Sequence, residues 1–151
     1  MLDVGDRAPD FATTDDTGGP VTLASLLADG PLVLYFYPAD FTPVCTREAC
    51  MFRDVHPELT AAGVRIFGVS PQGESSHAAF RAEHDLPFPL LADADRRLVK
   101  AYGASGPFGI GVRRVSYFIA ADGRVADREV ADLRVARHQG FVERVLARAR
   151  P

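Results

Sequence analysis

Apolar runs and amphipathic segments alternate along most of the chain. Residues 32–36 (LVLYF) are apolar at both alternating sets of positions, which is typical of a central strand covered on both faces. Further strands are predicted at 64–69, 88–91, 115–120 and 124–130, and helices at 45–62, 75–84, 93–102 and 134–150. Alternating strands and helices, followed by a hairpin and a closing helix, predict an α/β fold with a central mixed β-sheet flanked by helices.

Turn and capping residues set the boundaries of several elements. Residues 15–20 (DDTGGP) predict the turn of a short hairpin, and residues 122–123 (DG) predict a two-residue hairpin turn. Thr22 is the expected N-cap of a short helix over 23–27. Pro57 is expected to break or kink the helix that starts at Cys45, because proline lacks an N–H and clashes with the preceding turn.

Composition and charge narrow the class of protein. A chain of 151 residues with 47% hydrophobic and 25% charged content predicts a single globular domain over residues 1–151. The net charge of -3 gives no basic field, so neither nucleic acid nor an anionic membrane is an expected partner. No apolar run is long enough to cross a bilayer, and the N-terminus lacks the features of a signal peptide. Two cysteines form no disulfide framework, so a cytoplasmic location is expected.

Residues 35–50 (YFYPADFTPVCTREAC) carry the strongest chemical signal. An apolar strand leads through a loop with two prolines into a helix that is expected to open at Cys45. Pro38 ends the strand, and Pro43 fixes φ just before the helix, where no N–H is needed. Unpaired N–H groups and the positive end of the dipole at a helix start would stabilise a thiolate at Cys45. We therefore interpret Cys45 as a reactive thiol, the alternative being a small buried apolar residue.

The segment resembles the active-site motif of a known family. The pattern Pro38-x-x-x-Thr42-x-x-Cys45 is similar to the motif of the peroxiredoxins, and Cys50, five residues further on, matches the branch of bacterioferritin-comigratory and PrxQ-like proteins. Residues 5–11, 67–70 and 114–119 resemble the opening and two core strands of that family. The resemblance implies a thioredoxin-like fold and a thioredoxin-dependent antioxidant peroxidase without a bound cofactor.

The resemblance also implies roles for the two thiols. Cys45 would be the peroxidatic residue, which attacks hydrogen peroxide or an organic hydroperoxide and becomes a sulfenic acid. Cys50 would resolve this acid as an intramolecular disulfide, which thioredoxin or a similar dithiol protein then reduces. A buried structural thiol is the other interpretation of Cys50.

Three further side chains are candidates for the site. Thr42 could direct its hydroxyl at the sulfur and the peroxide, or simply cap the loop. Spacing alone does not choose between the neighbouring residues Arg113 and Arg114. The resemblance selects Arg114 as the guanidinium that favours the thiolate and steadies the peroxide. Glu48 is expected to complement the helix dipole and, as in the family, to help orient the arginine.

Other functions remain as alternatives to the peroxidase. A redox-sensing binding protein switched by a Cys45–Cys50 disulfide uses the same two thiols. A thioredoxin-type reductase is disfavoured, because its cysteines are separated by two residues. The four histidines, at positions 56, 77, 84 and 138, are not at metal-ligand spacing with the cysteines and are interpreted as solvated or hydrogen-bonded side chains. No metal is expected, and the chain is expected to be a monomer or weak homodimer.

Helix geometry predicts a conformational step. Five residues along one α-helix place two Cα atoms about 8.6 Å apart and on different faces. A disulfide rarely spans more than about 6.8 Å between Cα atoms. If Cys45 and Cys50 share one continuous helix, their disulfide requires the first turns to unwind.

Overall fold

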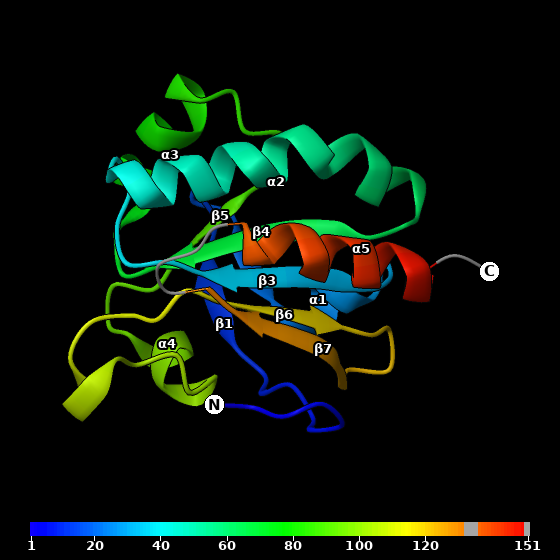
Figure 1. Cartoon of the computed structure of the whole chain (residues 1–151). Coiled ribbons are helices and arrows are strands. Elements are labelled where there is room, and N and C mark those ends of the chain that lie inside the picture. The colour runs from blue at the N-terminus through cyan, green and yellow to red at the C-terminus, as the bar shows by residue number, and fades with distance from the viewer. Residues whose placement is uncertain (132–135, 150–151) are drawn as a thin grey trace.

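The centre of the protein is a five-stranded mixed sheet with the strand order β5-β4-β3-β6-β7 (Figure 1). In this computed structural model, which describes residues 1–131 and 136–149, the strands are β3 (Leu32–Phe36), β4 (Arg65–Ser70), β5 (Leu90–Ala92), β6 (Val115–Ile119) and β7 (Val125–Val130). β3, β4 and β5 are parallel, while β6 runs antiparallel to both β3 and β7. The mixed α/β sheet predicted from the sequence is therefore confirmed.

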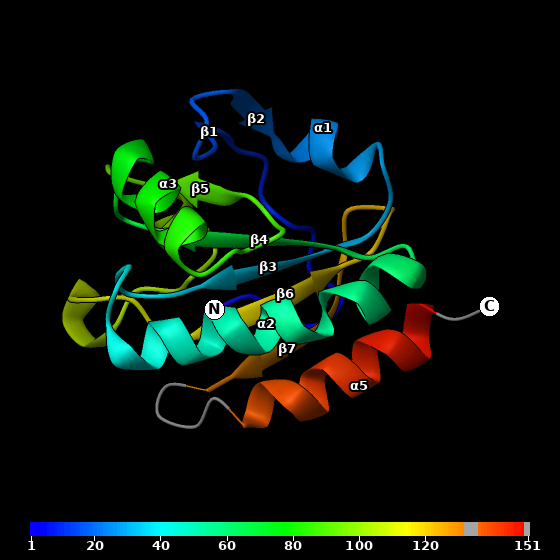
Figure 2. The same ribbon diagram turned by 90° about the horizontal axis from the view of Figure 1, so that it is seen from above.

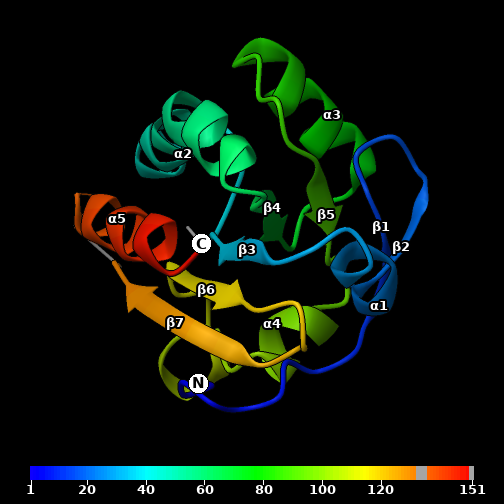
Figure 3. The same ribbon diagram turned by 90° about the vertical axis from the view of Figure 1, so that its right-hand side faces the viewer.

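Helices cover both faces of the sheet, as Figures 2 and 3 show. One face packs against α2 (Pro43–Ala61), α3 (Glu74–Glu83) and α5 (Arg137–Ala149). The other packs against the short helices α1 (Leu23–Leu27) and α4 (Arg97–Ala101). The remaining elements are the strands β1 (Ala12–Thr14) and β2 (Pro20–Thr22) and the 3-10 turn η1 (Pro107–Gly109). The arrangement is thus a three-layer sandwich in which the longest described helix, α2, packs against β4 and, through Phe52, against Tyr35 of β3.

The central strand β3 is buried along its whole length. Its side chains alternate between two cores: Leu34 faces the α4 side and Tyr35 faces the α2 side. Tyr35 stacks on Phe52 of α2 with ring centroids 4.6 Å apart. Gly68 of β4 makes room for this ring, because a Cβ there would lie 2.9 Å from the Tyr35 ring. Residues 32–36 are therefore apolar at every position because helices cover both faces of this strand, as the sequence predicted.

The hairpins and caps agree with the sequence in most respects. β1 and β2 pair in an antiparallel hairpin, and Thr22 caps α1 in a reciprocal capping box with Ser25. The second turn is one residue longer than predicted, because Ala120 N bonds to Arg124 O and leaves residues 121–123 in the loop. Gly123 takes a φ of +87° there, as expected in a three-residue hairpin loop with a glycine in the left-handed region.

Several helix boundaries differ from the prediction. α2 begins at Pro43 and continues through Pro57 to Ala61, so of the break or kink predicted at Pro57 the break is wrong. α4 is shorter than the predicted 93–102 because Asp93 instead accepts bonds from the N–H groups of Leu98 and Val99, at 3.0 and 2.9 Å. α5 begins at Arg137, and the predicted helical residues 134, 135 and 150 lie outside the described residues.

Candidate active site

The chain leaves β3 through a loop that leads directly to α2. Tyr37 N donates to Val69 O at 3.1 Å, which extends the sheet pairing by one residue before Pro38 ends it. Phe41 then adopts a φ of +65°, an unusual conformation for a bulky side chain, and its ring contacts Phe80 of α3. The loop therefore turns sharply and delivers Thr42 to the start of the helix.

Cys45 lies in the first turn of α2. Thr42 is the N-cap and Pro43 the first helical residue, so Cys45 is the third residue of the helix, not the first as predicted. The first helical hydrogen bond runs from Thr46 N to Thr42 O at 2.9 Å. The backbone N–H of Cys45 precedes this bond, as do all N–H groups at a helix start. The buried Cys45 sulfur thus lies at the positive end of the helix dipole.

Thr42 uses its hydroxyl within the loop. Oγ1 donates to Ala39 O at 2.9 Å, and the side chain makes no capping bond to the helix. This contact corresponds to the loop-capping interpretation made from the sequence. A hydroxyl that donates to Ala39 O still has lone pairs with which to accept a hydrogen bond from a peroxide.

Arg114 contacts the sulfur of Cys45. Its Nη1 donates to Cys45 Sγ at 3.0 Å, and the arginine is only 8% exposed. The register explains the contact, because Val115 pairs with Phe36 at the end of β3 and thereby places Arg114 beside the loop. The backbone is held there by a bond from Ala131 N to Arg114 O at 2.8 Å. A cation buried against sulfur favours the thiolate over the neutral thiol.

Glu48 is fully buried behind Arg114. Its Oε1 lies 3.7 Å from Arg114 Nη1, and its Oε2 lies 3.3 Å from Nδ1 of His138, from the first turn of α5. Burial raises the pKa of Glu48 to about 8, and the charge of Arg114 offsets this only in part. The raised pKa favours the neutral carboxyl, which complements a helix dipole less well than a carboxylate does, and the expected dipole role of Glu48 stays a prediction.

His138 is a site residue that sequence reasoning missed. The sequence predicts a solvated or hydrogen-bonded side chain, but the ring is fully buried, and neither nitrogen is in hydrogen-bond geometry with any described residue. Burial, followed by the nearby charge of Arg114, lowers the pKa of His138 to about 4. The periodicity of α5 could have predicted this burial, because His138 lies on the same helix face as the apolar residues Phe141, Val142 and Val145.

A second buried network holds the loop from the side of α3. The carboxylate of Asp40 accepts from Tyr37 Oη at 2.6 Å and from Ser76 Oγ at 2.8 Å, and it contacts His77 Nδ1 at 2.8 Å. The other ring nitrogen of His77 lies 3.0 Å from Leu91 O. Sequence reasoning passed over Asp40, whose partners are up to 37 residues away and meet it only through the fold.

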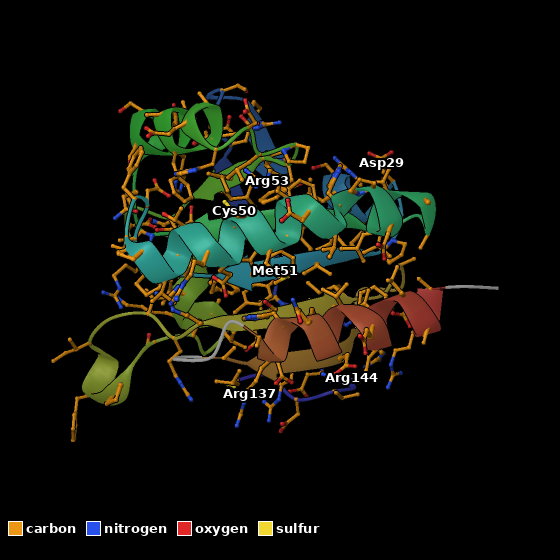
Figure 4. All side chains as sticks on the ribbon, turned by 45° about the horizontal axis from the view of Figure 1, so that its top comes forward. Asp29, Cys50, Met51, Arg53, Arg137 and Arg144 are labelled. Atoms are coloured by element: carbon orange, nitrogen blue, oxygen red, sulfur yellow. The ribbon has the colours of Figure 1, made fainter. Side chains whose placement is uncertain are left out.

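Cys50 is not brought to Cys45. Both thiols are free and belong to the same uninterrupted helix, on which Cys50 lies half-exposed further along (Figure 4). The structure therefore assembles Cys45, Arg114, Glu48 and His138 into one cluster and leaves the second thiol outside it. Within the described residues, no group of three histidine, cysteine or acidic side chains is placed to hold a metal ion.

This arrangement has counterparts among known proteins. The AhpC/TSA family model matches residues 4–128. Peroxiredoxin Bcp of Bacillus subtilis (strain 168) is 38% identical over 130 residues, which cover 82% of this chain and 82% of that protein. Chloroplastic peroxiredoxin Q of Arabidopsis thaliana is 41% identical over 122 residues, 80% of this chain and 56% of the plant protein.

Solved structures give the same result. The crystal structure of peroxidoxin BcpB from Mycobacterium tuberculosis superimposes with a TM-score of 0.91 at 34% identity, over 100% of both chains. Peroxiredoxin Q of Xanthomonas campestris gives a TM-score of 0.87 at 30% identity, over 99% of this chain and 98% of the other. The thioredoxin-like fold implied by the sequence is therefore confirmed, and the chain belongs to the AhpC/TSA family, as a peroxiredoxin of the Bcp/PrxQ branch and hence a thiol peroxidase.

Proposed function

We propose that Cys45 is the peroxidatic thiol of this peroxidase and that Cys50 resolves it. The observation that carries the proposal is the 3.0 Å contact from Arg114 Nη1 to Cys45 Sγ in the first turn of α2. A buried guanidinium and a helix start both favour a thiolate, which is the nucleophilic form of cysteine. The family resemblance assigns this guanidinium a second task, which is to hold the peroxide oxygens by charge-assisted hydrogen bonds.

The first step breaks the O–O bond of the peroxide. The Cys45 thiolate attacks one peroxide oxygen, an S–O bond forms, and the other oxygen leaves with the bonding electrons. The leaving oxygen takes up a proton and departs as water or an alcohol. Cys45 is oxidised to the sulfenic acid, and the peroxide is reduced.

The second step forms the disulfide. The thiol of Cys50 attacks the sulfur of the sulfenic acid, an S–S bond forms, and water leaves. Because α2 runs uninterrupted through both residues, its first turns must unwind before the sulfurs meet. Thioredoxin or a similar dithiol protein then reduces the disulfide and regenerates both thiols.

We expect hydrogen peroxide and organic hydroperoxides as substrates. The Xanthomonas campestris bacterioferritin comigratory protein, related at 30% identity and a TM-score of 0.87, has an alkyl peroxide reduction activity. None of the described helices is long and apolar enough to cross a bilayer. A cytoplasmic location, where dithiol reductants are present, suits this cycle, and a monomer or weak homodimer stays our expectation.

The number of peroxide equivalents that the protein consumes distinguishes a catalytic peroxidase from a redox-sensing binding protein. Peroxide consumption coupled to thioredoxin, its reductase and NADPH should continue for many equivalents in the wild type and stop in Cys45→Ser, because a serine hydroxyl is scarcely ionised. Consumption of a single equivalent of peroxide followed by binding of a partner protein would support the sensor. Sustained turnover by Cys45→Ser would show that the nucleophile is another residue.

A further inference from the structure

Four buried side chains beneath Cys45 carry polar atoms without a hydrogen-bond partner. Among the described residues these are Tyr35 Oη, both carboxyl oxygens of Glu48, Ser116 Oγ and both ring nitrogens of His138. They belong to one cluster, because Tyr35 and Ser116 are register partners and both the Tyr35 and His138 rings pack against Phe52. Unpaired buried polar atoms are costly and rare, so their accumulation around a reactive thiol calls for a functional explanation.

Arg114 and Glu48 connect this cluster to the sulfur of Cys45. Arg114 donates to Cys45 Sγ at 3.0 Å, and Glu48 Oε1 lies 3.7 Å from the same guanidinium nitrogen. Glu48 is therefore placed to compete with the thiolate for one positive charge. His138 lies on the far side of Glu48, with Nδ1 3.3 Å from Oε2 and both side chains fully buried.

We propose that His138 is a positioning residue for the reaction of Cys45. Nδ1 of His138 accepts a hydrogen bond from the O–H of a neutral Glu48 carboxyl, so that Glu48 does not compete with the Cys45 thiolate for the charge of Arg114. The contact is within ion-pair distance but is not aligned as a hydrogen bond. The terminal torsion of a glutamate is soft, so a rotation of the carboxyl group brings the two atoms into line. The inference rests on Cys45 being the peroxidatic thiol.

Burial favours the neutral form of the pair, whereas the charge of Arg114 opposes it at Glu48 and supports it at His138. Among the described residues, Arg114, just before β6, is a charged group that acts on both members of the pair, and Tyr35 on β3 faces both Glu48 and Cys45. Burial raises the pKa of Glu48 to about 8 and lowers the pKa of His138 to about 4. Both shifts favour a protonated carboxyl beside a neutral imidazole, and the charge of Arg114 further disfavours an imidazolium.

The neutral pair makes a specific prediction about His138. A hydrogen bond to the neutral form of an acid raises its pKa, so removal of the imidazole acceptor should make Glu48 easier to ionise. An ionised Glu48 would bind Arg114 more tightly and weaken its hold on the thiolate. His138 should therefore affect Cys45 only through the charge of Glu48.

A double-mutant cycle isolates this effect. In a Cys50→Ser background, the rate of Cys45 alkylation by iodoacetamide is followed by mass spectrometry across pH, and the midpoint of the profile reports thiolate formation. His138→Leu removes the acceptor at similar volume, His138→Asn restores an acceptor near the position of Nδ1, and His56→Leu on the outer part of α2 is the control. Each is measured with Glu48 and with Glu48→Gln, and circular dichroism verifies folding.

We expect His138→Leu to raise the midpoint by about one pH unit, a tenfold loss of thiolate at a fixed lower pH. His138→Asn should restore most of the shift, and His56→Leu should have no effect. In the Glu48→Gln background His138→Leu should change nothing, because the amide carries no charge. An unchanged midpoint in His138→Leu, or an equal shift in both backgrounds, would overturn the proposal.

Two further outcomes keep the test decisive. If His138→Leu does not fold, Glu48→Gln alone decides: an unchanged midpoint supports a neutral Glu48, and a large fall in the midpoint refutes it. The reaction with hydrogen peroxide is measured separately in the Cys50→Ser protein. A Cys45 that alkylates but does not react with peroxide would contradict the proposed function, while the alkylation cycle would still decide the role of His138.

Discussion

At the scale of single residues, the guanidinium beside Cys45 makes the sharpest prediction. Arg114→Lys should lower the rate with peroxide by about 100-fold or more, because an ammonium does not reproduce the planar fork that serves sulfur and peroxide together. Arg113→Lys is the matched control, one residue away, and should retain nearly full activity. The second-order rate constant for peroxide checks both. Loss of activity in Arg113→Lys with a normal Arg114→Lys would place the functional arginine one residue earlier.

The buried carboxylate of Asp40 should contribute strongly to stability. Asp40→Ala leaves His77 without its 2.8 Å partner and frees the Tyr37 hydroxyl, so a loss of about 3–5 kcal/mol is expected. The control is Asp54→Ala, which breaks an ion pair whose side chains are 36% and 69% exposed and should cost less than about 1 kcal/mol. Urea denaturation measures both. Equal losses would mean that the Asp40 network has no special role.

Individual residues also show where sequence reasoning succeeds. The motif singled out Cys45 and the resemblance selected Arg114, and the structure brings these two side chains into contact. Asp40 and His138 were not identified, because their partners come from segments 37 and 90 residues away along the chain. Nothing local in the sequence distinguishes a buried Glu48 from a solvated one, since its burial depends on how α5 packs.

At the scale of secondary structure, the apolar pattern predicted most elements and their type. Double-sided apolarity placed β3 correctly, and the turn residues located both hairpins. Pro57 does not break α2, in contrast to the prediction, because packing of a long helix against the sheet contributes more stability than one proline removes locally. The start of α2 was displaced by two residues for a related reason: Pro43 serves as the first helical residue instead of standing ahead of it.

The continuity of α2 leads to a prediction about motion. Amide hydrogen exchange in residues 45–55 should rise sharply after one equivalent of peroxide, because the disulfide holds the first turns unwound. Exchange in β3 should change little, since that strand is central and fully buried. Equal protection of residues 45–55 in the reduced and disulfide forms would show that no unwinding accompanies resolution.

At the scale of the whole molecule, the raised pKa of Glu48 should appear in the pH dependence of stability. Between its ordinary value of 4.5 and about 8, the folded protein holds a proton that the unfolded chain has lost, so this contribution falls as pH rises. The contribution of His138 to stability rises with pH between about 4 and 6.5, because over this range the unfolded chain holds a proton that the folded protein has lost. The contributions of Glu48 and His138 to the slope of stability against pH therefore have opposite signs between pH 4.5 and 6.5. From pH 6.5 to 8, only the contribution of Glu48 still changes of these two.

Wild type should therefore lose about 2 kcal/mol more stability than Glu48→Gln between pH 6.5 and pH 8. The measurement is urea denaturation of both proteins at a series of pH values. Parallel curves over this range would show that Glu48 is already ionised in the folded protein. The single-domain organisation predicted for residues 1–151 stays a prediction, and a single cooperative transition in these experiments would support it.

In the proposed cycle, Cys45 is oxidised by peroxide and then forms a disulfide with Cys50. Mass spectrometry of a single turnover is the most direct test of these two steps. Reduced protein is treated with one equivalent of hydrogen peroxide, quenched by alkylation and digested. The wild type should lose two hydrogen atoms and yield a peptide cross-linked between Cys45 and Cys50, while Cys50→Ser should retain one added oxygen on Cys45. An added oxygen on Cys50, or a disulfide that joins two chains in place of Cys45 and Cys50 of one chain, would contradict the proposed mechanism.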